Sequence, residues 1–283
     1  MFFRFCLFSS FLFLSTLVVA ESKTANHGFP ASEDSSNPIS VRESNTELQI
    51  SVGKSIFVFG KAKGTLDKVK VGMHVLPFSQ VAGTEGNQNT TFSKVTWKRL
   101  KNGAIQIQSS YYPWPGMLTW TVFANGELKM ETASQSGFDF KSGWIGLGFN
   151  YPDLLLNQIS WKNADNHADS HHSVWKNTSF TPMADPELEI TKDGDGFFQP
   201  FHQVKLEFET ITLSVRSETP GLHLRFGQVV DNTTTFPQIT ADLAFLLNHQ
   251  VPNSNSIPQS PSETSTTEQT ISLNPLVLWF HFQ

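Results

Sequence analysis

The residues most capable of chemistry are concentrated in one short polar segment. Residues 165–172 read Asp-Asn-His-Ala-Asp-Ser-His-His, which places three imidazoles and two carboxylates within eight residues. Side chains of these types bind divalent cations. High-affinity metal sites, however, usually draw ligands from several segments that an ordered second shell holds in place. We therefore interpret the segment as a hydrophilic loop and predict neither a metal site nor a cofactor.

Histidine and glutamate residues elsewhere could act as general base and acid on a sugar, as an epimerase requires. Glu207 and Glu209 are the glutamate candidates, but they alternate with apolar residues and are expected to share one face of a strand. An exposed strand face explains both without catalysis, so we name no catalytic residue. The histidine candidates for such a pairing are His167, His171, His172, His202 and His223.

Aromatic side chains offer flat apolar surfaces on which sugar rings can stack. In a sandwich without disulfides, most tryptophans are core residues. The run Tyr112-Pro-Trp114-Pro differs, because two prolines interrupt a strand ladder and favour a loop. We therefore predict a loop here, with Trp114 as a candidate ligand contact.

Alternation of apolar and polar residues runs through most of the chain and predicts β-strands. Asn102-Gly103 and Asn125-Gly126 each separate two such runs, and Asn-Gly suits the positive φ angles of a tight hairpin turn. Residues 239–247 are the one helix candidate. The apolar run at 276–282 is expected to return to the core as a closing strand. Together these patterns predict an all-β, antiparallel sandwich.

The start of the chain is predicted to carry an export signal. Residues 1–20 combine Arg4 with an apolar run that ends in Val-Val-Ala, which is typical of a cleavable signal peptide. Cleavage would remove Cys6, the only cysteine, so the mature chain is expected to form no disulfide. We expect a secreted or periplasmic protein without a membrane span. Sequons at Asn89, Asn177 and Asn232 fit surface loops of an exported protein.

The remaining residues are expected to form one large domain or two closely packed ones. Residues 21–45 are polar and are predicted to be a flexible leader, whereas residues 46–283 carry the strand pattern. Within the domain, residues 252–270 are rich in Ser, Thr and Pro and are predicted to be a mobile loop. The formal net charge of −5 at pH 7, without a dense Lys/Arg cluster, argues against nucleic acid as a partner.

An ordered series of motifs connects the chain to a known family. They are Val95-Thr-Trp-Lys-Arg-Leu-Lys-Asn-Gly103, Leu118-Thr-Trp-Thr-Val122, Gly146-Leu-Gly-Phe-Asn-Tyr-Pro152, Val174-Trp-Lys-Asn177 and Gly221-Leu-His-Leu-Arg-Phe226. In this order they resemble the C-terminal domain of glycoside hydrolase family 2 β-galactosidases. The resemblance implies an antiparallel β-supersandwich, like that of galactose mutarotase, over nearly the whole mature chain.

One departure from the family points to candidate site residues. The family's glycine-rich turn, which borders its substrate cleft, is replaced here by residues 162–172, and Thr178 stands where the family has Arg. By resemblance, this region and the Trp114 loop would contact a sugar. The candidate sugar-binding residues are Trp114, Trp161, His167, His171, His172, Trp175 and Asn177.

A second departure concerns activity. Retaining glycosidases need two carboxylates about 5 Å apart, and family 2 presents them on a barrel of about 250 residues. This chain shows no alternation of strands and helices and contains no Asn-Glu dipeptide, which commonly carries the acid/base of the family. We expect no hydrolase activity. The leading hypothesis is a non-catalytic domain that binds carbohydrate or docks on a separate glycoside hydrolase barrel subunit. The alternatives are a mutarotase-like or epimerase-like enzyme using His and Glu, and a structural exported β-protein without a ligand.

Overall fold

The computed structural model of the chain is an antiparallel β-sandwich. The structure describes residues 37–82, 90–133, 135–136, 144–152, 155–162, 177–180, 199–226, 240–248, 272–273 and 275–283. No α-helix lies within these ranges, and every strand pair in them is antiparallel. The predicted all-β, antiparallel fold class is therefore confirmed. None of the described residues belongs to a helix long and apolar enough to span a membrane.

A sheet of nine strands forms one layer of the sandwich. The closing strand predicted at 276–282 is confirmed, and it lies in the middle of this sheet. Its neighbours come from distant parts of the sequence. In spatial order the strands are β14 (Asn177–Phe180), β13 (Leu156–Lys162), β16 (Gln203–Phe208), β17 (Thr212–Ser217), β21 (Val277–Phe282), β10 (Leu128–Thr132), β9 (Met117–Val122), β8 (Ile105–Tyr112) and β7 (Thr91–Arg99).

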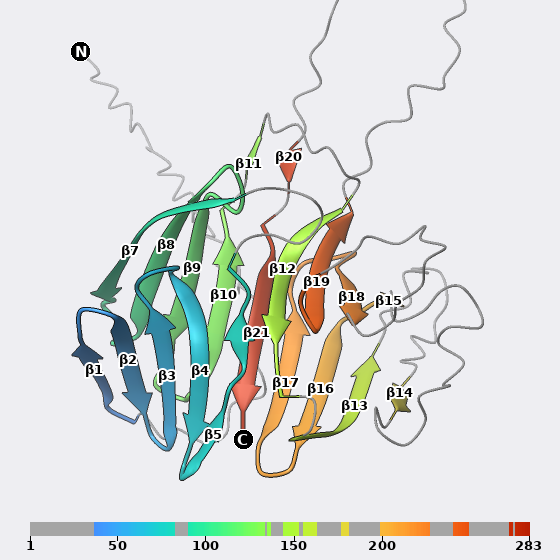
Figure 1. The fold of residues 1–283 in the computed structure, drawn as a ribbon, viewed down its shortest axis with the longest axis horizontal. Helices are drawn as coiled ribbons and strands as arrows, with labels where there is room; N and C mark the ends of the chain where they lie inside the picture. The colour runs from blue at the N-terminus through green and yellow to red at the C-terminus, as the bar shows by residue number, and fades with distance from the viewer. Residues whose placement is uncertain are drawn as a thin grey trace, which may run out of the picture.

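Two five-stranded sheets form the opposite layer, in front of the nine-stranded sheet in Figure 1. The first contains β1 (Ile39–Glu43), β2 (Glu47–Val52), β3 (Ser55–Gly60), β4 (Thr65–Val71) and β5 (His74–Leu76) in sequence order. The second has the order β15 (Gln199–Pro200), β18 (His223–Phe226), β19 (Leu243–Asn248), β12 (Trp144–Asn150) and β6 (Ser79–Gln80). A separate ribbon pairs β11 (Gln135–Ser136) with β20 (Ser272–Leu273).

Both predicted Asn-Gly hairpins are confirmed. Asn102-Gly103 joins β7 to β8, and Asn125-Gly126 joins β9 to β10. The two glycines have φ angles of 83° and 87°, which only glycine adopts without strain. The second hairpin also fixes the position of Glu127, the residue that follows its glycine.

The helix predicted at 239–247 is wrong. Residues 243–248 form β19, which is paired on both sides by β12 and β18. The run Leu-Ala-Phe-Leu-Leu is buried throughout, so it lacks the alternation that marks a strand with one exposed face. A short apolar run of this kind has no period that separates a buried strand from a helix.

The domain also begins earlier than the sequence suggested. Strand β1 starts at Ile39, inside the segment assigned to the flexible leader, and pairs with β2 along its whole length. Only Ile39 is fully buried, because β1 is an edge strand with most of its residues exposed. Because an edge strand buries few side chains, it can consist mostly of polar residues. The polar composition of this segment therefore led to a predicted domain boundary that lies too late in the sequence. The predicted signal peptide at 1–20 and the predicted mobile loop at 252–270 lie outside the described residues.

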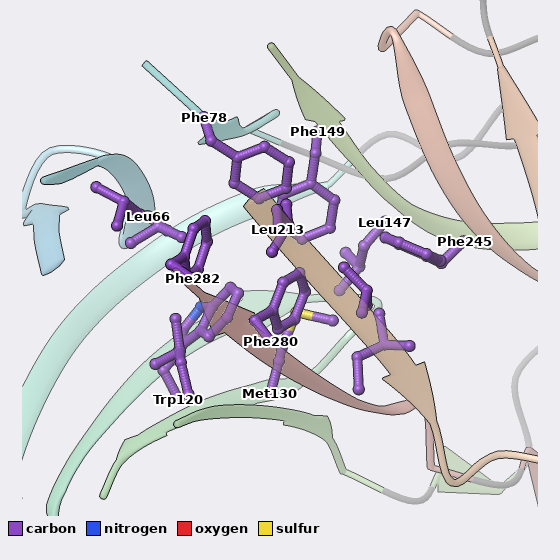
Figure 2. Close-up of a cluster of buried hydrophobic side chains, with 14 of the residues drawn as sticks. Leu66, Phe78, Trp120, Met130, Leu147, Phe149, Leu213, Phe245, Phe280 and Phe282 are labelled. Carbon is purple, nitrogen blue, oxygen red and sulfur yellow. The ribbon is translucent and has the colours of Figure 1, made fainter. Parts of the chain in front are cut away.

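Aromatic side chains from the two layers meet in a single core. In Figure 2, Trp120, Phe280 and Phe282 of the nine-stranded sheet point toward Phe78 and Phe149 of the opposite layer. The rings of Phe149 and Phe280 lie 5.5 Å apart, and those of Trp120 and Phe280 lie 5.3 Å apart. Because one face of the large sheet is covered by this core, a site on that sheet can only lie on its other face or at its edges.

Candidate functional site

The sequence-predicted site residues do not form one group in the described part of the chain. Trp114 lies in the predicted loop between β8 and β9, but its ring is 1% exposed and packs in the core. Trp161 on β13 is also a core residue, 7% exposed. Asn177 begins β14. The other four predicted residues, His167, His171, His172 and Trp175, lie outside the described residues.

The burial of Trp114 removes its ring from contact with solvent. The loop is irregular as predicted, and the carbonyl of Trp114 accepts a hydrogen bond from the hydroxyl of Thr90 at 2.8 Å. The exposed aromatic ring of this segment belongs to Tyr112, which is 77% exposed. A sugar could stack on Trp114 only after the loop moved away from the core.

Two of the described candidates for acid–base chemistry, Glu207 and His223, are also separated. Glu207 points away from the core on β16, as the alternation predicted, and bonds to Lys205. His223 lies on β18 in the opposite layer, where its ring packs against Trp144 at 4.9 Å. Burial lowers the pKa of His223. The two residues therefore belong to different sheets and do not pair.

A different set of polar and aromatic residues gathers on the face of the nine-stranded sheet that points away from the core. We call it the outer-face cluster. Strand β21 alternates strictly, so Leu278, Phe280 and Phe282 are buried while Trp279 and His281 point outward. The cluster consists of Phe123, Glu127, Lys129, Arg216, Glu218, Trp279 and His281.

The register of the central strands brings these residues together. Trp279 lies between Arg216 of β17 and Lys129 of β10. The β10–β21 ladder ends at the pair Leu128–Phe280, so Glu127, one residue earlier, comes level with His281. These three strands are separated by up to about 150 residues in sequence, and only the sheet makes them neighbours.

The aromatic part of the cluster is centred on Trp279. Its ring stacks on Phe123, with centroids 5.3 Å apart and planes 22° from parallel. The ammonium of Lys129 lies 5.6 Å from the centre of the Trp279 ring, within the range of a cation–π contact. Its indole Nε1 donates a hydrogen bond to Glu218 at 2.7 Å. These contacts fix the plane of the ring on the outer face.

The charged part of the cluster is centred on Glu127, which is only 6% exposed. Its backbone N–H donates to Asn125 Oδ1 at 3.1 Å, and its Oε2 accepts from Asn125 Nδ2 at 2.8 Å. The hairpin turn thus orients the carboxylate. The strand register places Glu127 level with His281, and the charge of Glu127 opposes the lowering of the pKa of both Arg216 and His281.

Burial dominates the electrostatics of both partners. It lowers the pKa of Arg216, although the charges of Glu218 and Glu127 oppose the shift. It also lowers the pKa of His281, against the charge of Glu127. His281 is therefore a neutral imidazole at pH 7. The side-chain amide nitrogen of Gln283 lies 3.1 Å from its Nε2.

Chemically, the cluster offers a carboxylate, a guanidinium and a neutral imidazole beside an aromatic ring. Partly buried, perturbed charges of this kind are enriched at functional sites. Within the described ranges, no group of three or more His, Cys, Asp or Glu residues could hold a metal ion.

The sequence analysis missed His281 and Glu127. The signal for His281 was available, because the alternation that predicted the closing strand also places Trp279 and His281 on the face opposite Phe280. No comparable local signal marks Glu127 or Arg216. Their role depends on the pairing of β10 and β17 with β21, which are distant in sequence.

Comparisons with known proteins show no family for this chain. No family model and no curated protein matches the chain. Among solved structures, the chain is similar to the GalM/aldose epimerase homologue from C. elegans, at 10% sequence identity and a TM-score of 0.43, covering 86% of this chain and 99% of that chain. A likeness at this level says nothing about activity, which has to be argued from the residues of the site.

Proposed function

We propose that this is an exported, carbohydrate-associated protein that binds sugar on the outer-face cluster. The observation that carries the proposal is the half-buried Trp279 ring beside the charged groups of Glu127 and Arg216 and the neutral imidazole of His281. Sugar recognition needs an apolar surface for the ring and directional hydrogen bonds for the hydroxyls. The cluster combines both on one face of a single sheet.

The resemblance of the motifs to the C-terminal domain of family 2 β-galactosidases supports the same ligand class. We propose a galactose mutarotase-like supersandwich without a catalytic barrel, which binds glycan or docks on a separate barrel subunit. The Asp/His segment at 165–172, with Trp175 and Asn177, remains a proposed second source of polar contacts. Localisation outside the cytoplasm, after loss of a signal peptide, belongs to the same proposal.

A glycan array followed by isothermal titration tests sugar binding. Trp279→Ala should weaken the best glycan at least about tenfold, because it removes the apolar surface, whereas Trp279→Phe should retain most of the affinity. Tyr112→Ala is the matched control, since it removes an exposed aromatic at the distant end of β8. Equal affinity in folded Trp279→Ala protein would contradict the proposal. Failure of every glycan would favour a structural protein without a ligand.

A second candidate function, sugar epimerisation, is favoured by the juxtaposition of His281, Glu127 and Arg216. A neutral imidazole can accept the proton of an anomeric hydroxyl, and a guanidinium can stabilise negative charge on the ring oxygen as the ring opens. Polarimetry of freshly dissolved α-galactose tests this activity. Acceleration by the wild-type chain that His281→Asn abolishes would establish it, and a rate equal to that in buffer would exclude it for galactose.

A further inference from the structure

A groove at the open edge of the sandwich lies on the opposite side of the nine-stranded sheet from the outer-face cluster. It occupies about 260 Å³ between the last strand of that sheet, β7, and strands β1 to β3 of the first five-stranded sheet. Figure 1 shows β7 beside these strands at the left of the molecule. Trp97 points into it, because it pairs with the core-facing Ile107 in the β7–β8 ladder.

Two hydrogen bonds hold the walls of the groove together. The guanidinium of Arg99 donates through Nη2 to the carbonyl of Ile39 at 2.9 Å, which links β7 to β1. The indole Nε1 of Trp97 donates to Glu43 Oε2, also at 2.9 Å. The groove is therefore pre-formed, and a ligand would not have to order its walls on binding.

The groove has an apolar base and an aromatic wall. Leu48 and Phe59 line it and are 2% and 1% exposed. The Trp97 ring is 37% exposed, which makes it one of the few large apolar side chains that the described residues leave open to solvent. Its hydrogen bond to Glu43 fixes the ring plane, so stacking on it would cost little side-chain entropy.

The polar groups of the groove form a neutral pair. Glu43 Oε1 lies 2.5 Å from Lys61 Nζ, and its Oε2 accepts from Trp97. The hydrogen bonds from Lys61 and Trp97 lower the pKa of Glu43, so it stays ionised at neutral pH. Lys61 has further N–H groups that can donate to a ligand, and Glu43 has further lone pairs that can accept from one. Since the two charges cancel, the groove favours a neutral ligand over a cation or an anion.

We propose that this groove is a second sugar site, which binds one neutral pyranose ring stacked on Trp97 with its hydroxyls bonded to Glu43 and Lys61. Pockets for drug-sized ligands measure about 300–1,000 Å³, so a groove just below this range suits a ligand of one sugar ring. The ring's C–H face matches the indole, and adjacent hydroxyls can both donate to Glu43 and accept from Lys61. The site is separate from the outer-face cluster and does not depend on it.

NMR of the tryptophan side chains tests the proposal on the full chain. The chain has seven tryptophans and therefore seven indole N–H signals. The signals of Trp97 and Trp279 are identified by their loss in Trp97→Phe and Trp279→Phe. Methyl α- and β-pyranosides of glucose, galactose and mannose serve as probes. At least one should shift the Trp97 signal in a saturable way, because the indole N–H and its acceptor Glu43 both lie at the site.

The variants separate the two sites. In titrations followed by the Trp97 signal, the double change Glu43→Gln/Lys61→Met should weaken binding at the groove at least about fivefold, whereas Trp279→Ala should leave it unchanged. Trp97→Ala removes this signal, so its loss of affinity, also at least about fivefold, is measured by isothermal titration in the Trp279→Ala background. If the outer-face cluster binds no sugar, a pyranoside should still shift the Trp97 signal and leave the Trp279 signal unchanged. A Trp97 signal that no pyranoside moves, or that moves only with charged sugars or short peptides, would overturn the second site.

Discussion

Trp279 of β21 donates its indole hydrogen to the exposed carboxylate of Glu218, with 2.7 Å between Nε1 and Oε1. Glu218 follows directly after β17, so this bond joins the end of one strand to the middle of its neighbour. Together with the stacked ring of Phe123, it holds the indole in one orientation on the outer face.

Removing this bond should loosen the proposed sugar platform without unfolding the protein. Glu218→Ala should weaken binding at the outer face by about threefold, the effect of losing one solvent-exposed hydrogen bond that orients a contact. Glu218→Gln retains an acceptor oxygen and should restore most of the affinity. Titration calorimetry measures both, and the melting temperature should stay the same because Glu218 is exposed. A Gln variant as weak as the Ala variant would argue against the positioning role.

The full chain should not hydrolyse aryl β-galactosides above background between about pH 4 and pH 8, the range in which paired carboxylates commonly work. The reason is that the described strands form antiparallel sheets and not the barrel that presents the two carboxylates in family 2. Release of nitrophenol measures the rate. Turnover that one Glu→Gln change abolishes would show that the chain carries its own hydrolytic site.

Stability should fall as the pH is lowered through the range below about 6.5. Burial lowers the pKa of His281 and His223 in the folded state, so the unfolded chain binds protons first as the pH falls. This contribution to stability is fully present above the unfolded pKa of about 6.5 and is lost on acidification. Thermal unfolding from pH 5 to pH 8 measures the slope.

Variants identify the source of that slope. His281→Asn should flatten the decline of the melting temperature at acid pH. His74→Asn is the matched control, because His74 on β5 is exposed in the folded chain as in the unfolded one. A slope that neither His281→Asn nor His223→Asn reduces would assign the acid sensitivity to other groups.

Gly146 should tolerate no side chain. A Cβ added to it would lie 2.0 Å from the carbonyl oxygen of Phe245, in the paired strand β19. Because this oxygen belongs to the backbone, relief requires the two strands to separate, and Gly146→Ala should cost at least about 2 kcal/mol in the free energy of unfolding. Gly72→Ala meets no atom within 4 Å and adds only backbone strain at φ 60°, about 1 kcal/mol. Urea unfolding compares them, and equal losses would contradict the steric argument.

Two aromatic residues of the core should respond differently to truncation. Phe280 packs against Phe78, Trp120, Phe149 and Phe245, so Phe280→Ala should cost about 3–5 kcal/mol. Trp120 is fully buried, but its Nε1 has no hydrogen-bond partner among the described residues. An unpaired buried donor destabilises the fold by about 1–3 kcal/mol. Trp120→Phe removes this cost, which offsets the loss of packing volume. Its net cost should stay within about 1 kcal/mol in urea unfolding. A larger loss would mean that the indole packing outweighs the unpaired donor.

The sequence by itself determined most strands, both Asn-Gly hairpins and the closing strand. Each of these depends on local chemistry: period-two alternation follows from the geometry of a strand with one buried face, and Asn-Gly follows from the positive φ angles of its turn. The same alternation in residues 276–282 places Phe280 on one face of the strand and Trp279 and His281 on the other. Where local chemistry is ambiguous, as in the wholly apolar β19, the sequence prediction was wrong.

Only the tertiary structure decided which strands are neighbours, and with them the candidate sites. β21 is inserted between β17 and β10, which brings Arg216 and Glu127 to Trp279 and His281. The burial of Trp114 and the position of Trp97 opposite Glu43 are likewise long-range facts. Sequence patterns report the faces of single strands, whereas the order and register of strands in a sheet follow from packing two layers around one aromatic core. This packing involves strands from the whole domain, so no single segment of the sequence determines it.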